Sequence, residues 1–486
     1  MNKISCFLPY AGKEQVEKTV NSLQATGLIE EIRLITTDAT LESLPDCEIL
    51  FVDMPYSSAT LKAIANTAKG EYTLLYTKET TLEMGMFALE RMIHILEDSS
   101  AGMVYADHYQ IADGKQSNAP VIDYQFGSLR DDFNFGSLLL FNTEKLKEAA
   151  GHMKSDYNFA GLYDLRLKLS QHSDLVHINE YLYSEVENDT RKSGEKIFDY
   201  VDPKNRDRQI EMEQACTEHL KEIGGYLAPE FKKIEFSAGN FEYEASVIIP
   251  VRNRIRTIRD AIKSVLMQKT DFKYNLIIID NHSTDGTTEA IDEFKDDERV
   301  IHIIPERNDL GIGGCWNVGV HHPKCGKFAV QLDSDDVYKD ENTLAIMVRA
   351  FYEQNCAMVV GTYMMTDFNM NMIAPGIIDH KEWTPANGRN NALRINGLGA
   401  PRAFYTPVLR EVKVPNTSYG EDYALGLNFS RQYQIGRVYD VVYLCRRWDD
   451  NSDASLDIVK MNGHNLYKDR IRTWELQARI AMNKNK

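Results

Sequence analysis

Three aspartates follow a largely apolar run in the second half of the chain. Asp333, Asp335 and Asp336 come directly after residues 328–332 (FAVQL), which are typical of a buried strand. Two carboxylates spaced by one residue can face the same way from an extended backbone. Hard oxygen ligands of this kind suit Mg²⁺ or Mn²⁺, which bridge phosphates. The spacing therefore predicts a site for a divalent cation and a phosphate, and an acidic turn that caps the next helix is the alternative.

Two other predicted strands also end in polar residues. Asp280 ends the β-branched run at 275–280, and its carboxylate could accept a hydrogen bond from a ring nitrogen of a base. Arg252 follows a second apolar run, at 245–251. Ligands bind at the carboxyl ends of the strands in α/β sheets, so we expect the three strand ends to converge on one crevice. Each motif alone is weak evidence, because a DGT turn that caps a helix is commonplace.

Five motifs in a fixed order are more specific than any one of them. They are IPVRN (249–253), IIIDNHSTDGT (277–287), NDLGIGGCWNVG (308–319), LDSDD (332–336) and YGEDYALGL (419–427). With these motifs, residues 246–455 resemble the inverting family 2 glycosyltransferases of GT-A fold. The resemblance implies transfer of a sugar from a nucleotide diphosphate, with UDP as the expected nucleotide, to an acceptor hydroxyl.

The resemblance assigns a donor side to the site. It implies that Asp280 contacts the base, that Asp333 contacts the ribose or the metal, and that Asp335 binds the metal on the diphosphate. Mn²⁺ or Mg²⁺ is the implied cofactor. The nucleotide-binding residues implied in this way are Pro250, Val251, Arg252, Asn253, Asp280, Asn308, Asp333 and Ser334.

The resemblance also assigns an acceptor side. Asp422 is the implied general base, and base catalysis of this kind typically supplies ~10²–10⁴-fold. The candidate acceptor contacts are Glu421, which precedes Asp422, and Trp383 and Arg402. An aromatic face and a guanidinium both suit sugars or their acidic groups. The alternatives are a solvated helix start for the acidic pair and core packing for Trp383.

The chain departs from the family pattern at two places. Trp316 stands where many members carry an arginine, so Arg252 or Arg307 would have to supply that phosphate contact. Near the end, RRWDDNSD offers Arg447 and then Asp449 where many members carry an arginine followed by a histidine. Asp449 is a third candidate metal ligand, with an exposed acidic loop as the alternative.

The elements that position these residues occur twice. Apolar runs at 4–9, 32–36 and 71–76 repeat the runs at 245–251, 275–280 and 327–333, with helical patterns between them. Alternating strands and helices predict two α/β GT-A domains with mostly parallel sheets. We expect a first domain at 1–200, a helical linker at 201–240 and a catalytic domain with a C-terminal helix at 241–486. The alternative is that the linker residues close the first domain.

The first copy lacks the acidic motif. Aligning EYTLLYTKET with FAVQLDSDDV sets residues 76–79 against 333–336, and no carboxylate then faces Asp333 or Asp335. Asp164 aligns with Asp422, although Tyr163 replaces the glutamate before it. We therefore expect a non-catalytic domain. A second, metal-independent transferase, which would make the chain a two-activity polymerase, is the competing interpretation.

The composition limits the remaining classes. The 486 residues carry a formal charge of -17, which argues against a nucleic-acid partner. The seven cysteines form no CxxC pair, and no signal-like or 18-residue apolar segment occurs, so we expect a cytoplasmic protein. The basic helical pattern from His464 could lie on a membrane surface, but packing against the catalytic domain is favoured.

Three function classes remain after these observations. A metal-dependent inverting glycosyltransferase of polysaccharide or glycoconjugate synthesis is favoured. A binding module without turnover is the second class, and it fits the first copy best. A nucleotidyltransferase is the third, and it is disfavoured because IPVRNR lacks a Gly-rich basic loop.

Overall fold

The computed structural model describes residues 3–42, 44–187, 205–237, 239–448, 451 and 456–485. The chain forms two compact units. In the described residues, the first unit contains residues up to 187, 205–225 and 456–473, and the second contains 226–451 and 474–485. Among the described residues, no helix is both long enough and apolar enough to cross a lipid bilayer.

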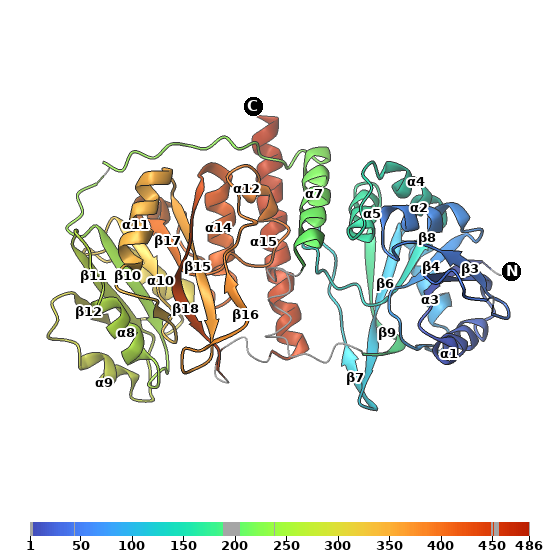
Figure 1. Cartoon of the computed structure of the whole chain (residues 1–486), viewed down its shortest axis with the longest axis horizontal. Coiled ribbons are helices and arrows are strands. Elements are labelled where there is room, and N and C mark those ends of the chain that lie inside the picture. Colours follow the sequence, from blue (N-terminus) through green and yellow to red (C-terminus); the bar gives the residue numbers. More distant parts are fainter. Residues whose placement is uncertain are drawn as a thin grey trace. The chain divides into compact units, whose positions relative to one another are not determined.

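The first unit is an α/β domain built on a nine-stranded sheet, drawn from blue to cyan in Figure 1. The sheet order is β3-β2-β1-β4-β8-β6-β9-β5, with β7 paired to β6. Its strands are β1 (Ile4–Pro9), β2 (Ile29–Thr36), β3 (Glu48–Phe51), β4 (Tyr72–Tyr76), β5 (Leu82–Met84), β6 (Met103–Ala112), β7 (Lys115–Ala119), β8 (Leu138–Asn142) and β9 (Leu175–Val186). Its helices are α1 (Lys13–Gln24), α2 (Ser58–Thr67), α3 (Ala88–Asp98), α4 (Thr143–His152), α5 (Gly161–Ser170) and α7 (Arg206–Glu222).

The second unit repeats this topology. Its sheet order is β12-β11-β10-β13-β17-β15-β18-β14, with β16 paired to β15. The strands are β10 (Ala245–Val251), β11 (Tyr274–Asp280), β12 (Val300–Ile303), β13 (Phe328–Gln331), β14 (Val337–Tyr338), β15 (Met358–Thr366), β16 (Met372–Ile378), β17 (Arg402–Tyr405) and β18 (Ile435–Arg446). The helices are α8 (Ile258–Leu266), α9 (Thr287–Asp292), α10 (Ile312–His321), α11 (Thr343–Gln354), α12 (Gly388–Asn391), α13 (Thr406–Val412) and α14 (Glu421–Gln432).

Both sheets are mixed. In the second unit, β12, β11, β10 and β13 are parallel, whereas β17 runs antiparallel to β13 and to β15. The run of β10, apolar except for Ser246, is buried on both faces, as expected of a central parallel strand. In α8, Ile258, Ala261, Ile262 and Val265 are buried at helical spacing. The α/β class predicted from the sequence is thus confirmed for both units.

The boundaries differ from those predicted. Helix α7, which we expected in a linker at 201–240, packs on α5 and belongs to the first unit, as the alternative interpretation had it. Helix α15 (Ile458–Lys484) does not belong wholly to the second unit, because residues 456–473 group with the first. In the second unit, Leu476 and Arg479 are fully buried.

The sheet registers correct the alignment of the two copies. Ile4 pairs with Tyr72 in the first sheet, and Ala245 pairs with Phe328 in the second, so Tyr72 corresponds to Phe328. Counting onward, Thr77 corresponds to Asp333 and Glu79 to Asp335, one residue away from the alignment made on sequence. A shift of one residue in a strand moves every side chain to the other face, which is why the error matters.

The helix that carries the predicted base is also shifted. Helices α5 and α14 begin the same number of residues before the strands β9 and β18 that follow them. Gly161 therefore corresponds to Glu421, and Leu162, not Asp164, corresponds to Asp422. Tyr163 and Tyr423 then share a position, and each hydroxyl donates to a backbone carbonyl, that of Leu129 or of Ala392.

Candidate active site

The candidate site begins with Asp280 and the turn that follows β11. Asp280 is fully buried and accepts hydrogen bonds from Ser283 N at 3.0 Å and Thr288 Oγ1 at 2.5 Å. Burial raises the pKa of Asp280, but the imidazole of His302, 3.6 Å away, and hydrogen bonds from Ser283 and Thr288 outweigh it and hold this pKa well below its usual range. Asp280 is therefore a fixed anionic acceptor at a strand end.

The turn after β10 packs on the turn after β11. Asn253 has a left-handed φ of 54°, and its Oδ1 accepts a hydrogen bond from Thr284 N at 2.8 Å. Pro250 and Val251 end β10 beside Asp280, since Val251 and Asp280 are register partners. The two predicted strand ends thus lie together.

Two of the predicted nucleotide contacts lie on the surface. Arg252 and Asn308 are exposed. Arg307, the alternative phosphate contact, pairs with Asp309 at 2.6 Å and is exposed as well.

The acidic motif is held where β13 ends. Asp333 Oδ1 accepts a hydrogen bond from Gln331 Nε2 at 2.8 Å, and Asp333 N donates to the hydroxyl of Tyr443 at 3.1 Å. Asp335 Oδ2 accepts from Asn451 Nδ2 at 3.2 Å and lies 3.7 Å from Arg254 Nε. Asp333 and Asp335 therefore remain partly accessible, and Ser334 between them is buried.

Asp336 has a different role from the other two aspartates. It is buried, and its Oδ1 accepts a hydrogen bond from the backbone N of Arg446 at 2.8 Å. Arg446 Nε in turn donates to the carbonyl of Asp335 at 2.5 Å. Burial first, and then the charges of Asp335 and Asp333, raise the pKa of Asp336 well above its usual value. Asp336 fixes the turn and is not exposed as a ligand.

Arg402 lies between the predicted base, Asp422, and the acidic motif and interacts with both. Arg402 Nη1 lies 2.8 Å from Asp422 Oδ2. The Arg402 backbone N donates to Gln331 Oε1 at 3.1 Å, so Gln331 joins the start of β17 to Asp333. Burial lowers the pKa of Arg402, but the carboxylates of Asp422 and Asp333 raise it above its usual value. Asp333, Arg402 and Asp422 therefore form one electrostatic group.

Glu421 directly precedes Asp422, and its pKa is raised. Burial, with a further contribution from Asp422, raises the pKa of Glu421 to about 8, and its Oε2 is buried without a hydrogen-bond partner within the described part of the chain. Glu421 is consequently protonated at neutral pH and can donate a hydrogen bond.

The Gly-rich motif positions the segment that leads into α14. A Cβ on Gly313 would lie 1.8 Å from the carbonyl oxygen of Pro415, so only glycine allows this approach. Gly313 N donates to Thr417 O at 2.9 Å, and Asn416 Oδ1 accepts from Gly311 N at 2.8 Å. The Gly-rich motif therefore holds in place the backbone segment that leads to Asp422.

One predicted residue, Trp383, does not join the site. Trp383 is 2% exposed, which is the core packing given as the alternative, so its assignment as an acceptor contact is corrected. Asp449 lies outside the described residues. Residues that sequence reasoning missed are Gln331, Arg446 and Tyr443; Gln331 lay inside the motif FAVQLD and Arg446 beside Arg447, but nothing in the sequence indicated their partners.

The residues present fit a divalent cation. Burial raises the pKa of Asp333, Arg402 and a hydrogen bond from Gln331 lower it, and the charges of Asp335 and Asp422 raise it again, so that it ends above its usual value. The carboxylates are thus crowded, and a divalent cation would reduce their repulsion. Among the described residues, no three His, Cys, Asp or Glu side chains form a complete metal cage. Mg²⁺ characteristically binds one or two carboxylates together with substrate phosphates, and Asp333 and Asp335 supply that number.

Comparison with known proteins supports a shared family for part of the second unit. Residues 246–403 match the model of a family described as Glycosyl transferase family 2. An uncharacterized glycosyltransferase of Rickettsia felis is 37% identical over 198 residues, covering 40% of this chain and 31% of that protein. The putative teichuronic acid biosynthesis glycosyltransferase TuaG of Bacillus subtilis is 29% identical over 126 residues, covering 26% of this chain and 49% of that protein.

The chain thus spans less than half the length of these two relatives. Among solved structures, S. aureus TarS in complex with UDP-GlcNAc aligns with a TM-score of 0.38 and 18% identity, covering 49% of this chain and 72% of that one.

Proposed function

We propose that the second unit is a metal-dependent inverting glycosyltransferase, because residues 246–403 match the model of Glycosyl transferase family 2. It moves a sugar from a nucleotide diphosphate donor, UDP being the expected nucleotide, to an acceptor hydroxyl. The observation that carries the proposal is the ion pair of Arg402 with Asp422 beside Asp333. This ion pair supports the proposal because it joins the proposed base to the proposed diphosphate site.

On the donor side, buried Asp280 accepts a hydrogen bond from the base, and Pro250, Val251, Arg252, Asn253 and Asn308 surround the nucleotide. Asp333 contacts the ribose or the metal, with Ser334 beside it, and Asp335 holds the metal. Mn²⁺ or Mg²⁺ bound there would neutralise charge that develops on the leaving diphosphate. Asp449 remains a proposed third ligand.

On the acceptor side, the acceptor oxygen attacks the anomeric carbon from the face opposite the diphosphate. The bond from that carbon to the diphosphate oxygen breaks as the new glycosidic bond forms, and the hydroxyl proton passes to Asp422. Arg402 keeps Asp422 oriented and ionised, and protonated Glu421 donates a hydrogen bond to the acceptor. Attack from the opposite face inverts the anomeric centre.

The acceptor class is proposed as a glycan or glycoconjugate. A relative named for teichuronic acid biosynthesis supports this class. We propose that the first unit is non-catalytic, because Thr77 and Leu162 stand at the positions of Asp333 and Asp422.

Donor hydrolysis and calorimetry on the full chain test the proposal. With Mn²⁺, we expect UDP to bind and at least one UDP-sugar in a panel to be hydrolysed. Asp422→Asn should bind UDP normally and lose turnover, while Asp440→Asn, an exposed aspartate on β18, should match the wild type. Binding without turnover of any sugar nucleotide would favour the binding-module alternative, and absence of UDP binding would exclude both.

A further inference from the structure

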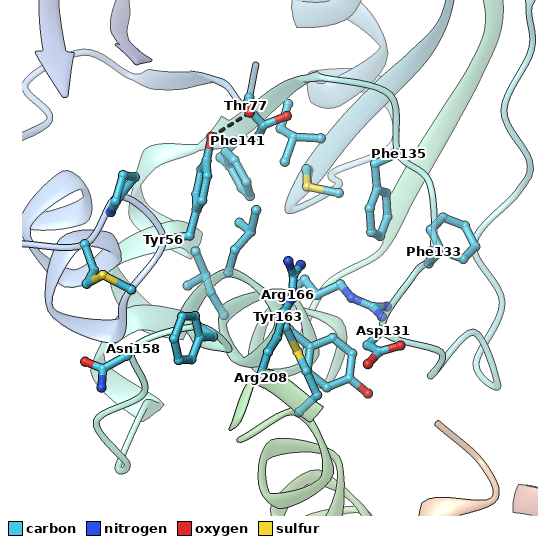
Figure 2. Close-up of a pocket in the computed structure, with 18 residues that line it drawn as sticks. Tyr56, Thr77, Asp131, Phe133, Phe135, Phe141, Asn158, Tyr163, Arg166 and Arg208 are labelled. Atoms are coloured by element: carbon cyan, nitrogen blue, oxygen red, sulfur yellow. Dashed lines mark hydrogen bonds between the residues drawn. The ribbon is translucent and has the colours of Figure 1, made fainter. Parts of the chain in front are cut away.

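The first unit has a pocket at the position of the second unit's candidate site. A cavity of ≈ 300 Å³ is lined by Thr77, Leu139 and Leu162, among others (Figure 2). Thr77 and Leu162 correspond to Asp333 and Asp422. Leu139 pairs with Leu75 on β4, and Arg402 lies opposite Gln331 on β13. Since Leu75 and Gln331 occupy the same position in the two sheets, Leu139 corresponds to Arg402. The three charged residues Asp333, Arg402 and Asp422 are thus replaced by uncharged residues that line a pocket.

The walls of this pocket are mostly aromatic and aliphatic. Figure 2 shows Tyr56 and Phe141 on one side and Phe133 and Phe135 on another. The Tyr56 hydroxyl already donates to the carbonyl of Thr77 at 2.5 Å, and burial raises the pKa of Tyr56 to about 12. Asp131 and Asn158 also line the pocket and add polar groups to its walls. A volume of this size lies at the lower end of the range for small-molecule sites.

Two arginines provide positive charge at the pocket. Arg166 is buried, and its guanidinium lies 4.7 Å from the ring centroid of Tyr163 and 5.5 Å from that of Phe135. Its hydrogen bonds go to the carbonyl oxygens of Ser128 at 2.8 Å and Arg130 at 2.6 Å. Within the described part of the chain, no carboxylate forms an ion pair with Arg166 or with exposed Arg208, which comes from α7.

A buried guanidinium that has carbonyl and ring contacts but no counter-ion favours a bound anion. An apolar cavity of this size would also destabilise the unit if it stayed empty, because its walls lose their contacts. The two arginines outnumber the one carboxylate in the lining, that of Asp131, so the pocket favours a ligand with an apolar body and one negative charge.

We propose that this pocket binds a small apolar anion, namely an aromatic or short aliphatic body that carries one carboxylate, sulfonate or phosphate. Arg208 and Arg166 attract the charged group, and the ring-lined cavity takes the apolar body. The proposal does not depend on the activity of the second unit, since every residue it uses lies in the first.

Two fluorescent probes that differ in charge test the proposal on the full chain. Anilinonaphthalene sulfonate is an apolar anion, and phenylnaphthylamine is its neutral analogue. We expect both to bind, the anion at least ten-fold more tightly. Arg208→Ala should weaken the anion about five-fold or more and leave the neutral probe unchanged, whereas Arg206→Ala, on the same helix but outside the lining, should change neither.

Blocking the pocket gives the second comparison. Leu162→Trp should weaken both probes at least ten-fold. Phe159→Asp, at an exposed rim position that tolerates substitution, should weaken the anion more than the neutral probe even if Leu162→Trp fails to fold. Phe126→Ala, an exposed phenylalanine outside the lining, is the matched control. Anion binding that survives Arg208→Ala and Phe159→Asp unchanged, or equal losses of both probes in these variants, would overturn the proposal.

Discussion

Arg402 and Asp422 form an ion pair of 2.8 Å that joins the interior strand β17 of the second sheet to helix α14. Arg402 is the first residue of β17, and Asp422 lies in the first turn of α14. Arg402 also interacts electrostatically with Asp333 on β13's side of the site. One guanidinium therefore links the proposed base to the proposed diphosphate site.

Replacement of Arg402 should make the proposed base harder to ionise. Loss of the neighbouring positive charge favours the protonated carboxyl of Asp422, so in Arg402→Met the acidic limb of the kcat/KM profile should move to higher pH. We expect kcat/KM at pH 7 to fall about 10²-fold or more, in the range typical of general-base catalysis. Measured pH–rate profiles check this, with exposed Arg349→Met on α11 as the control. A profile of Arg402→Met that keeps the wild-type acidic limb would contradict the role given to this pair.

Glu421 should impose an alkaline limb on the same profile. Because the pKa of Glu421 is raised to about 8, the proton it donates is lost above that pH, and the rate should fall. In Glu421→Gln the neutral donor persists, so the alkaline limb should disappear while activity at pH 7 stays within about five-fold. Exposed Glu289→Gln on α9 should keep the limb.

The same carboxyl should affect stability in a defined direction. A folded-state pKa of about 8, above the ordinary pKa of 4.5 for this side chain, means that the folded chain holds a proton that the unfolded chain releases. Stability therefore falls as pH rises from about 4.5 to about 8. Calorimetric unfolding should show a shallower fall for Glu421→Gln than for the wild type, and a parallel fall would show that Glu421 ionises normally.

Much of the site could be predicted because its strand ends carry local signals. Asp280, Asp333 and Asp335 each follow a run of apolar residues, and this pattern depends only on neighbours in the chain. Arg446 could not be predicted, because its contact with Asp336 joins residues 110 apart and requires the pairing of β14 with β18.

The alignment of the first unit with the second could not be predicted for the same reason, since it depends on contacts between residues far apart in the sequence. The α/β class of the first unit follows from its alternating strands and helices. The residue-by-residue alignment of the first unit with the second depends on strand pairings such as that of Ile4 with Tyr72. A sequence alignment one residue away placed Lys78 opposite Asp335, whereas the sheet places Glu79 there. The burial of Trp383 could not be decided from the sequence either, because buried positions are predicted from a periodic pattern and a single aromatic residue forms none.

The three aspartates of the acidic motif should separate by function. Asp335→Asn removes a proposed metal ligand, so the affinity for UDP in Mn²⁺ should fall about 10-fold to 100-fold, in keeping with the usual cost of disturbing a metal site. Asp336→Asn resembles the protonated carboxyl that its raised pKa indicates, and UDP affinity should stay within about three-fold. Calorimetry with Mn²⁺ and with chelator measures both, and chelator should abolish the difference between wild type and Asp335→Asn. Equal losses in the two variants would mean that the motif acts only through its fold.

Gly313 should affect catalysis without touching the substrate. A methyl group at this position would meet the carbonyl of Pro415 at 1.8 Å, so Gly313→Ala must displace the segment that leads to Asp422. Misplacing a catalytic group by about 1 Å can cost about 10²-fold, and we expect that loss in kcat. UDP affinity should be retained, because Asp280 and Asp335 lie on other strand ends. The matched control is Gly463→Ala, where a Cβ would meet no atom within 4 Å and a helical glycine is replaced by a better helix former. If Gly313→Ala kept full kcat, or lost UDP binding in parallel with kcat, the Gly-rich motif would not act by positioning the base.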